Sequence, residues 1–280
     1  MEQVILLNKN VSETPLECLE RFRGEHPEYA NVKMTYAGRL DPMASGLLVV
    51  LAGDMVHKKE EFLNLSKTYE ATIVLGIESD TFDCLGLVWN PPLHKGRWHE
   101  ALRVTEGSDV IETLNSFIGT YSQTYPAYSS KTVNGKQLHS ITRSHFAEPS
   151  RDRAPLILPT HMVTVEGISN IHVQEISVEE LVHDVIPKIK AVTGDFRQEE
   201  IIKSWENLGS YPLGLAEPRP LPLKGGDNTL TTVSFTISVS GGTYIRAIAD
   251  ELGKKLGTGA VLWKLRRTRV GDYSLSIKHM

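Results

Sequence analysis

The sequence has 280 residues, of which 40% are hydrophobic and 23% are charged. This size and composition allow a large buried core in one or two domains, and they exclude a wholly disordered chain. The formal net charge of −4 at pH 7 counts mildly against a nucleic-acid partner. Basic residues nevertheless gather at 131–153 and 254–278, where they form either two solvated faces or two surfaces that track a phosphate backbone.

Membrane and metal functions find no support in the sequence. No segment approaches the roughly 20 apolar residues that a membrane helix needs. The apolar run at 4–7 is too short for a signal peptide, and no basic segment precedes it. The only cysteines, Cys18 and Cys84, match no metal-ligand spacing. We therefore expect a soluble, cytoplasmic protein without a membrane partner or a metal site.

The first part of the chain predicts three strands and a helix. Residues 4–8 form a short apolar strand, and a helix over 15–23 follows with Thr14 as its N-cap. The continuous apolar run at 47–52 predicts a buried strand. Alternation over 69–75 predicts a strand with one apolar face.

The middle of the chain predicts a helix over 99–118, strands over 160–165 and 171–176, and helices over 178–192 and 198–208. The mixture of strands and helices lacks a regular βα alternation. This pattern indicates an α+β fold with a mixed sheet.

The C-terminal part predicts a strand, a turn and a helix. Apolar residues alternate over 233–239, and Gly241 and Gly242 make the turn. Helical spacing over 245–256 ends at Gly257, which is suited to a C-cap.

The most informative segment runs from Gly38 to Gly46 and reads Gly-Arg-Leu-Asp-Pro-Met-Ala-Ser-Gly. Pro42 biases Asp41 toward an extended backbone, and the buried strand that follows holds the loop. A carboxylate with so little conformational freedom suits catalysis. Taken alone, the pattern also fits an Asp-Pro turn or a helix cap.

This segment resembles the catalytic loop of the TruB-type pseudouridine synthases, which typically show Gly-x-Leu-Asp-Pro-x-Ala-Ser/Thr-Gly. The triplet Arg39-Leu40-Asp41 is also similar to the RsuA and RluA types, so the downstream motifs decide between them. Four further blocks are similar to TruB motifs and follow in the family's order: Lys67 to Gly86, Gln123 to Leu138, Ser240 to Arg246, and Gly259 to Gly271.

The resemblance implies a pseudouridine synthase fold, in which helices flank a mixed, mainly antiparallel sheet. It also implies a role for each matching residue. Asp41 is the expected catalytic carboxylate. The expected substrate-binding residues are Tyr69, which stacks on the target base, Arg246, which pairs with Asp41, Leu265, which lines the uracil pocket, and Tyr244. The expected RNA-binding residues are Lys9, which also fits a support role at the active site, Lys131, Lys136, Arg266 and Arg267.

One catalytic domain over residues 1–280 is the expected organisation. Within it, residues 121–159 form an RNA-binding insertion and residues 209–230 form a connector rich in Pro and Gly. Because the sequence ends soon after Arg269, we expect no appended PUA domain. The match to the family is poor between about 145 and 230.

Two positions depart from the family pattern. Asn10 stands where a proline is usual, which puts the local turn in doubt. Tyr36 stands where TruB-type enzymes usually carry a histidine, which can alter RNA contacts without removing the chemistry.

Other chemistries lack their motifs. The sequence has no His-Glu-x-x-His zinc motif, no Walker loop and no Gly-x-Ser-x-Gly. The resemblance implies an isomerase that needs no cofactor or metal and acts as a monomer on the tRNA T-arm, converting uridine 55 to pseudouridine. Asp41 can attack C1′ of the nucleotide or remove a 2′ proton to give a glycal, and both routes stay open. The alternatives are an rRNA pseudouridine synthase and a non-catalytic tRNA-folding chaperone.

Overall fold

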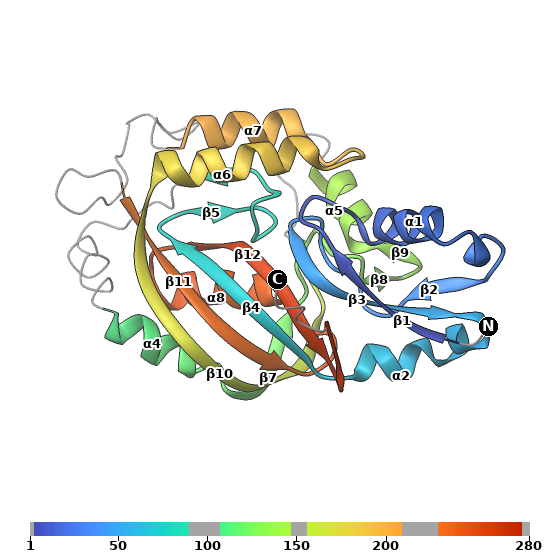
Figure 1. Cartoon of the computed structure of the whole chain (residues 1–280). Coiled ribbons are helices and arrows are strands. Elements are labelled where there is room, and N and C mark those ends of the chain that lie inside the picture. The colour runs from blue at the N-terminus through green and yellow to red at the C-terminus, as the bar shows by residue number, and fades with distance from the viewer. Residues whose placement is uncertain (1–2, 90–106, 147–155, 209–228, 276–280) are drawn as a thin grey trace, which may run out of the picture.

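The computed structural model describes residues 3–89, 107–146, 156–208 and 229–275. Its centre is a nine-stranded sheet (Figure 1). The strand order is β1 (Gln3–Lys9), β3 (Ala44–Ala52), β12 (Ala260–Val270), β4 (Lys67–Leu75), β11 (Thr229–Val239), β10 (Thr160–Ser177) and β7 (Gly119–Thr124), with β2 (Met34–Tyr36) on β3 and β13 (Tyr273–Ser274) on β12. Only β3 and β12 pair in parallel among the described strands. The expected mixed, mainly antiparallel α+β fold is confirmed.

Smaller elements surround this sheet. Two hairpins are formed by β5 (Glu78–Ser79) with β6 (Val88–Trp89), and by β8 (Thr132–Val133) with β9 (Lys136–Gln137). The described helices are α1 (Pro15–Glu25), α2 (Lys59–Asn64), α4 (Ser108–Asn115), α5 (Leu138–Phe146), α6 (Val178–Ala191), α7 (Gln198–Glu206) and α8 (Ile245–Leu256), and 3-10 turns cover Pro27–Tyr29 and Gly53–Lys58.

Helix α1 begins where the sequence predicts, because its first turn is capped on both sides. The Thr14 hydroxyl accepts a hydrogen bond from the Glu17 N–H at 3.2 Å, and the Glu17 carboxylate accepts one from the Thr14 N–H at 2.6 Å. This reciprocal pair satisfies two N–H groups that the helix leaves free. Pro15 occupies the first turn, where no N–H donor is needed.

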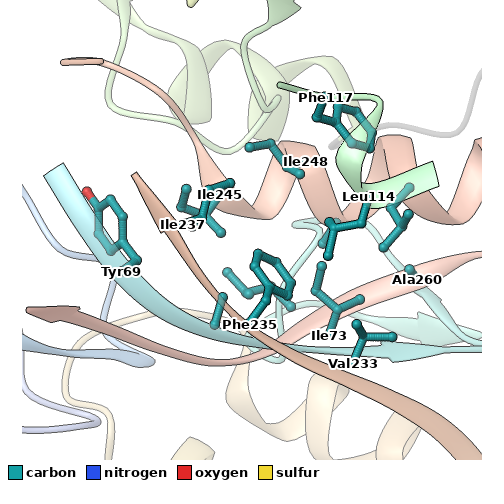
Figure 2. Close-up of a cluster of buried hydrophobic side chains, with 14 of the residues drawn as sticks. Tyr69, Ile73, Leu114, Phe117, Val233, Phe235, Ile237, Ile245, Ile248 and Ala260 are labelled. Atoms are coloured by element: carbon teal, nitrogen blue, oxygen red, sulfur yellow. The ribbon is translucent and has the colours of Figure 1, made fainter. Parts of the chain in front are cut away.

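The main core lies between the sheet and helices α8 and α4. The apolar face of β4, with Tyr69, Ala71 and Ile73, packs there against Phe235 of β11 and Ile248 of α8. Figure 2 shows this cluster, with Tyr69 at one end of the row of side chains. The predicted alternation of β4 is therefore confirmed, and it places the Tyr69 ring at the edge of the core.

Helices α6 and α7 pack on the other side of the sheet (Figure 1), against Val74 of β4 and Val261 of β12. At the far end of the sheet, α1 packs against Leu48 and Val50, and α2 packs against Leu47. Strand β3 is consequently buried on both faces, as its unbroken apolar run predicts.

One predicted boundary is wrong in β10. The sequence predicts two strands at 160–165 and 171–176, whereas one strand runs through both. The turn-like residues between them are absorbed by shifts in register against β11, one of them between Ser169 and His172. Asn170 lies there with a φ of 53°. Gly167 and Asn170 therefore mark irregularities within this strand and do not end it.

Three other predicted segments are described only in part or have different bounds in the structure. The helix predicted over 99–118 is described only as α4, and residues 99–106 lie outside the described residues. Residues 121–124 of the expected insertion belong to the sheet strand β7. The expected connector at 209–230 is described only at residues 229 and 230, which belong to β11, because β-branched residues extend that strand.

No helix within the described ranges is long and apolar enough to span a membrane.

Close packing of β3 against β12 leaves no room for a side chain at Gly46. This residue has a φ of 97°, and an added Cβ would lie 2.3 Å from the Arg267 carbonyl oxygen. We expect Gly46→Ala to lower the free energy of unfolding by at least about 2 kcal/mol, from strain and overpacking. Urea denaturation measures this change. Gly24→Ala in α1 is the control, because nothing lies within 4 Å of its added Cβ. Equal stability of the two variants would contradict the prediction.

Candidate active site

The loop that carries Asp41 leads directly into β3, and a buried lysine fixes it. The Lys9 ammonium donates to the carbonyl oxygens of Pro42 at 3.2 Å and Ala44 at 2.6 Å, and also to those of Asn10 and Glu13. Lys9 is fully buried, and burial lowers its pKa to about 8. The expected role of Lys9 in binding RNA is therefore wrong, because carbonyl groups already take its donors.

Arg267 holds the same loop from the opposite side. Its guanidinium donates to the carbonyl oxygens of Leu47 at 2.8 Å and Gly38 at 3.1 Å, and its side chain is 1% exposed. The expected RNA contact of Arg267 is corrected for the same reason as that of Lys9. Two cations thus bond to the backbone on either side of Asp41, which leaves this loop little freedom.

Arg246 and Asp41 lie together, as the motifs predict. The Nε atom of Arg246 lies 3.1 Å from Oδ2 of Asp41. The contact lacks hydrogen-bond geometry, so it is an ion pair. Arg246 is 4% exposed, whereas the Asp41 side chain is 44% exposed and open to a ligand.

The two terminal nitrogens of Arg246 bond to carbonyl oxygens. Nη1 donates to Thr81 at 2.8 Å and Nη2 to Tyr128 at 3.1 Å. Burial lowers the pKa of Arg246, but the nearby charges of Asp41 and Asp83 raise the pKa above its ordinary value. Arg246 thus stays charged, and three segments converge on its guanidinium.

The loop between β4 and β6 is built around the buried carboxylate of Asp83. It accepts hydrogen bonds from the Thr81 hydroxyl at 2.8 Å and the Leu85 N–H at 2.9 Å. The turn requires glycine at position 86, because a Cβ there would lie 2.3 Å from Thr81 Oγ1. These hydrogen bonds make Asp83 a structural residue of the turn.

Asp41 and Arg246 line a cavity of about 330 Å³. Tyr69 and Leu265 line it from the sheet, and Tyr244 lines it from the turn before α8. Tyr69 is 7% exposed, and burial raises the pKa of Tyr244. Flat apolar surfaces thus flank a carboxylate, which suits a planar ring held beside Asp41.

A second cavity, of about 430 Å³, adjoins the first and is also lined by Asp41 and Arg246. Its other walls come from α1, from the segment around Tyr128 and from the linker between α6 and α7. We call this linker, residues 192–197, the α6–α7 linker. No group of three or more potential metal ligands occurs in the part of the chain that the structure describes.

A family profile and two relatives match the sequence of this chain. The profile of the TruB family pseudouridylate synthase (N terminal domain) matches residues 27–181, more than half of the chain. The chain belongs to this TruB family. It is 28% identical to tRNA pseudouridine synthase B of Bifidobacterium longum (strain DJO10A) over 290 residues, covering 97% of this chain and 64% of that protein.

The Bacillus subtilis (strain 168) tRNA pseudouridine synthase B is 29% identical over 273 residues, which cover 97% of this chain and 66% of the relative. The chain thus spans about two thirds of the length of these TruB-family relatives. A crystal structure of a Cbf5-Nop10-Gar1 complex matches with a TM-score of 0.49 and 19% identity, over 97% of this chain and 49% of that chain.

The other RNA-binding residues expected in this TruB-family chain lie in different places. Lys131 and Lys136 are exposed at the β8–β9 hairpin, and Lys131 lies 5.0 Å from the ring centroid of Tyr125. Arg266 lies on the sheet face opposite Tyr69 and pairs with Glu70 at 3.2 Å. The structure therefore does not bring Arg266 together with Asp41.

Two residues of the TruB-family site escaped the motif analysis as functional groups. The motifs imply no role for Lys67, yet its ammonium donates to carbonyl oxygens of Leu63 and Leu65 beside the cavity. Burial, followed by the charge of Arg267, lowers the pKa of Lys67 to about 8. Arg197 lines the second cavity, and no local sequence signal marks it.

The two departures from the TruB pattern have simple local consequences. The Asn10 N–H donates to the Glu13 carboxylate at 2.9 Å, a bond that proline could not make. Tyr36 lies in β2, where the Lys59 ammonium lies 6.0 Å from its ring centroid. Both replacements therefore fit the fold without disturbing the Asp41 loop.

The raised pKa of Asp83 should make the stability of the fold depend on pH. Burial raises the pKa of Asp83 to about 6, and nearby Arg246 opposes this shift. An unfolded Asp has a pKa of about 3.9. Between these two pKa values, Asp83 is protonated in the folded chain and ionised in the unfolded chain. The extra proton stabilises the folded chain below about pH 4, and this stabilisation is lost as pH rises toward 6.

Comparison with Asp83→Asn isolates this contribution, because asparagine keeps an oxygen that can accept both hydrogen bonds. We expect the stability of the wild type, relative to that of the variant, to fall between about pH 4 and pH 6 and then to level off. Urea midpoints at several pH values measure it. A difference that does not change with pH would contradict the assignment.

Proposed function

We propose that this chain isomerises uridine to pseudouridine in tRNA, with Asp41 as the catalytic carboxylate. The observation that carries the proposal is the Asp41–Arg246 ion pair of 3.1 Å at a cavity lined by Tyr69 and Leu265. Membership of the TruB family supports the reaction. The names of the relatives, tRNA pseudouridine synthase B, support the choice of tRNA as the substrate.

The reaction breaks the bond between N1 of uracil and C1′ of ribose, rotates the base and joins C5 to C1′. The proton on C5 is lost and N1 gains one, so the product is an isomer and no electrons are exchanged. Asp41 attacks C1′ or takes a 2′ proton, and either role uses a carboxylate that is exposed and held by Arg246. The two routes share the same starting geometry.

The target base must leave its stack to enter this cavity. Extrusion costs a few kcal/mol, and stacking on an aromatic ring returns about 1–3 kcal/mol. Tyr69 offers such a ring at the edge of the main core, where Ala71 and Phe235 hold it. We propose uridine 55 of the T-loop as the target and the T-arm as the bound element. Action as a monomer in the cytoplasm stays a prediction.

Exposed lysines near the cavity offer contacts to the phosphate backbone. Lys131 and Lys136 extend from the β8–β9 hairpin, and Tyr128 and Ser130 of the preceding segment line the second cavity. Phosphate contacts position RNA without reading its sequence. We propose that this hairpin grips the T-arm while the cavity takes the extruded base.

The direct test is pseudouridine formation in an unmodified tRNA transcript, measured by nucleoside chromatography. We expect conversion by the wild type. We expect Asp41→Asn to be slower by roughly 10³-fold or more, because the catalytic carboxylate is gone. The affinity of Asp41→Asn for tRNA should stay within about threefold, since the amide has the same shape.

A transcript with cytidine at position 55 is the control and should gain no pseudouridine. If the wild type binds tRNA but converts nothing, tRNA isomerisation is excluded, and rRNA transcripts are tested next. If Asp41→Asn retains the biological activity of the wild type, the protein acts as a tRNA-folding chaperone.

The hairpin lysines predict a change in salt dependence. Each lost phosphate contact reduces the slope of log affinity against log salt by about 0.7–0.9. We expect the double variant Lys131→Gln and Lys136→Gln to reduce the slope for tRNA by about 1.5. Lys190→Gln, an exposed lysine of α6, is the matched control. An unchanged slope in the double variant would remove this hairpin from the RNA contact surface.

A further inference from the structure

The α6–α7 linker supplies three residues to the wall of the second cavity: Asp195, Phe196 and Arg197. Asp41 and Arg246 line the same cavity. No motif assigns a role to this part of the chain. The contacts of Arg197 connect it to the catalytic pair.

Arg197 has an unusual backbone for an arginine. Its φ of 63° and ψ of 34° lie in the left-handed region, immediately before the first turn of α7. Residues other than Gly, Asn and Asp seldom adopt this conformation, because Cβ crowds the following carbonyl group. Favourable side-chain contacts must therefore offset this local cost.

Those contacts are an ion pair and a ring contact. The Arg197 guanidinium lies 2.9 Å from Oδ2 of Asp80, and each side chain is 22% exposed. Its Cζ atom lies 4.7 Å from the ring centroid of Tyr128. The other carboxylate oxygen of Asp80 accepts a hydrogen bond from the Leu87 N–H at 2.9 Å. Arg197 thus connects the Asp80 carboxylate to the Tyr128 ring, and the Leu87 N–H holds that carboxylate in place.

The same two segments hold Arg246. Thr81, which follows Asp80, accepts the hydrogen bond from Nη1 of Arg246, and Tyr128 accepts the one from Nη2. Arg197 therefore contacts the side chain of Asp80, which precedes Thr81, and the ring of Tyr128, whose own carbonyl group bonds to Arg246. Its planar guanidinium can pair with a carboxylate and cover a ring at once, which an ammonium cannot do as well.

We propose that Arg197 is a positioning residue for the Arg246–Asp41 pair, and this inference rests on the proposed pseudouridine synthase function. Arg197 holds the Thr81 and Tyr128 segments together, their carbonyl groups fix the Arg246 guanidinium, and Arg246 fixes the carboxylate. The Arg246–Asp41 contact has no hydrogen-bond geometry. The two carbonyl groups therefore determine where the guanidinium lies.

The test compares Arg197→Gly and Arg197→Lys with the wild type in pseudouridine formation. Glycine suits the left-handed backbone and removes only the side chain. We expect Arg197→Gly to lower kcat at least about tenfold with tRNA affinity within about threefold, because a misplaced catalytic group slows the chemical step more than binding. Lysine keeps the charge opposite Asp80, so Arg197→Lys should recover part of the loss.

Lys188→Ala is the matched control. Lys188 forms a 2.6 Å ion pair with Asp184 within α6, and it lines neither cavity beside Asp41. We expect its kcat to match that of the wild type. An equal loss in Lys188→Ala and Arg197→Gly would show general destabilisation of α6 and α7, and it would overturn the proposal. A kcat of Arg197→Gly within twofold of wild type would also overturn it.

A second measurement does not depend on activity. In ¹⁵N-labelled protein, the Arg246 Nε–H signal is identified by its loss in Arg246→Lys. We expect this signal to shift or broaden in Arg197→Gly and to stay in place in Lys188→Ala. If the wild type forms no pseudouridine, the proposed function fails while this signal still decides whether Arg197 positions Arg246. An unmoved signal overturns the positioning role.

Discussion

The buried guanidinium of Arg246 is the group on which the site depends. A charge that is 4% exposed must be matched by acceptors, because an unmatched buried cation costs several kcal/mol. Thr81 and Tyr128 provide two carbonyl oxygens and Asp41 provides the opposite charge. This requirement brings the Asp41 loop, the loop after β4 and the segment before the β8–β9 hairpin to the start of α8. The Asp41 side chain is nevertheless 44% exposed.

The net charge of −4 for the whole chain does not describe the surroundings of Asp41. Lys9, Lys67, Arg246 and Arg267 are all buried near the Asp41 loop, and most of their donors bond to carbonyl oxygens that carry no full charge. Asp41 and Asp83 lie near Arg246 and offset part of this positive charge.

The sequence predicted the parts of this structure that follow from local pattern. Alternation in β4 placed Tyr69 on the core side, and helical spacing with Gly257 located α8. Ordered motifs predicted that Asp41 and Arg246 meet. Motifs do not tell whether a cation faces solvent or carbonyl groups, and for this reason they predict RNA contacts for Lys9 and Arg267, which are buried. That distinction depends on which loop covers each side chain, and loop packing is a long-range property.

Other features lay beyond any local pattern. Arg197 acts across more than a hundred residues on Asp80, so spacing cannot reveal the pair. Asn170 looks like a turn residue, yet pairing with β11 resumes at His172, and β10 runs continuously through Asn170. In both cases tertiary contacts outweigh local preference.

The central claim is that Asp41 and Arg246 act on a uridine held between Tyr69 and Leu265. A crystal structure of Asp41→Asn bound to a T-arm RNA hairpin tests it most directly, because the slow variant traps an unreacted nucleotide. We expect one extruded uridine with its ring against Tyr69 and its C1′ facing residue 41. A hairpin whose uridine stays stacked, or enters a site away from Asp41, would contradict the claim.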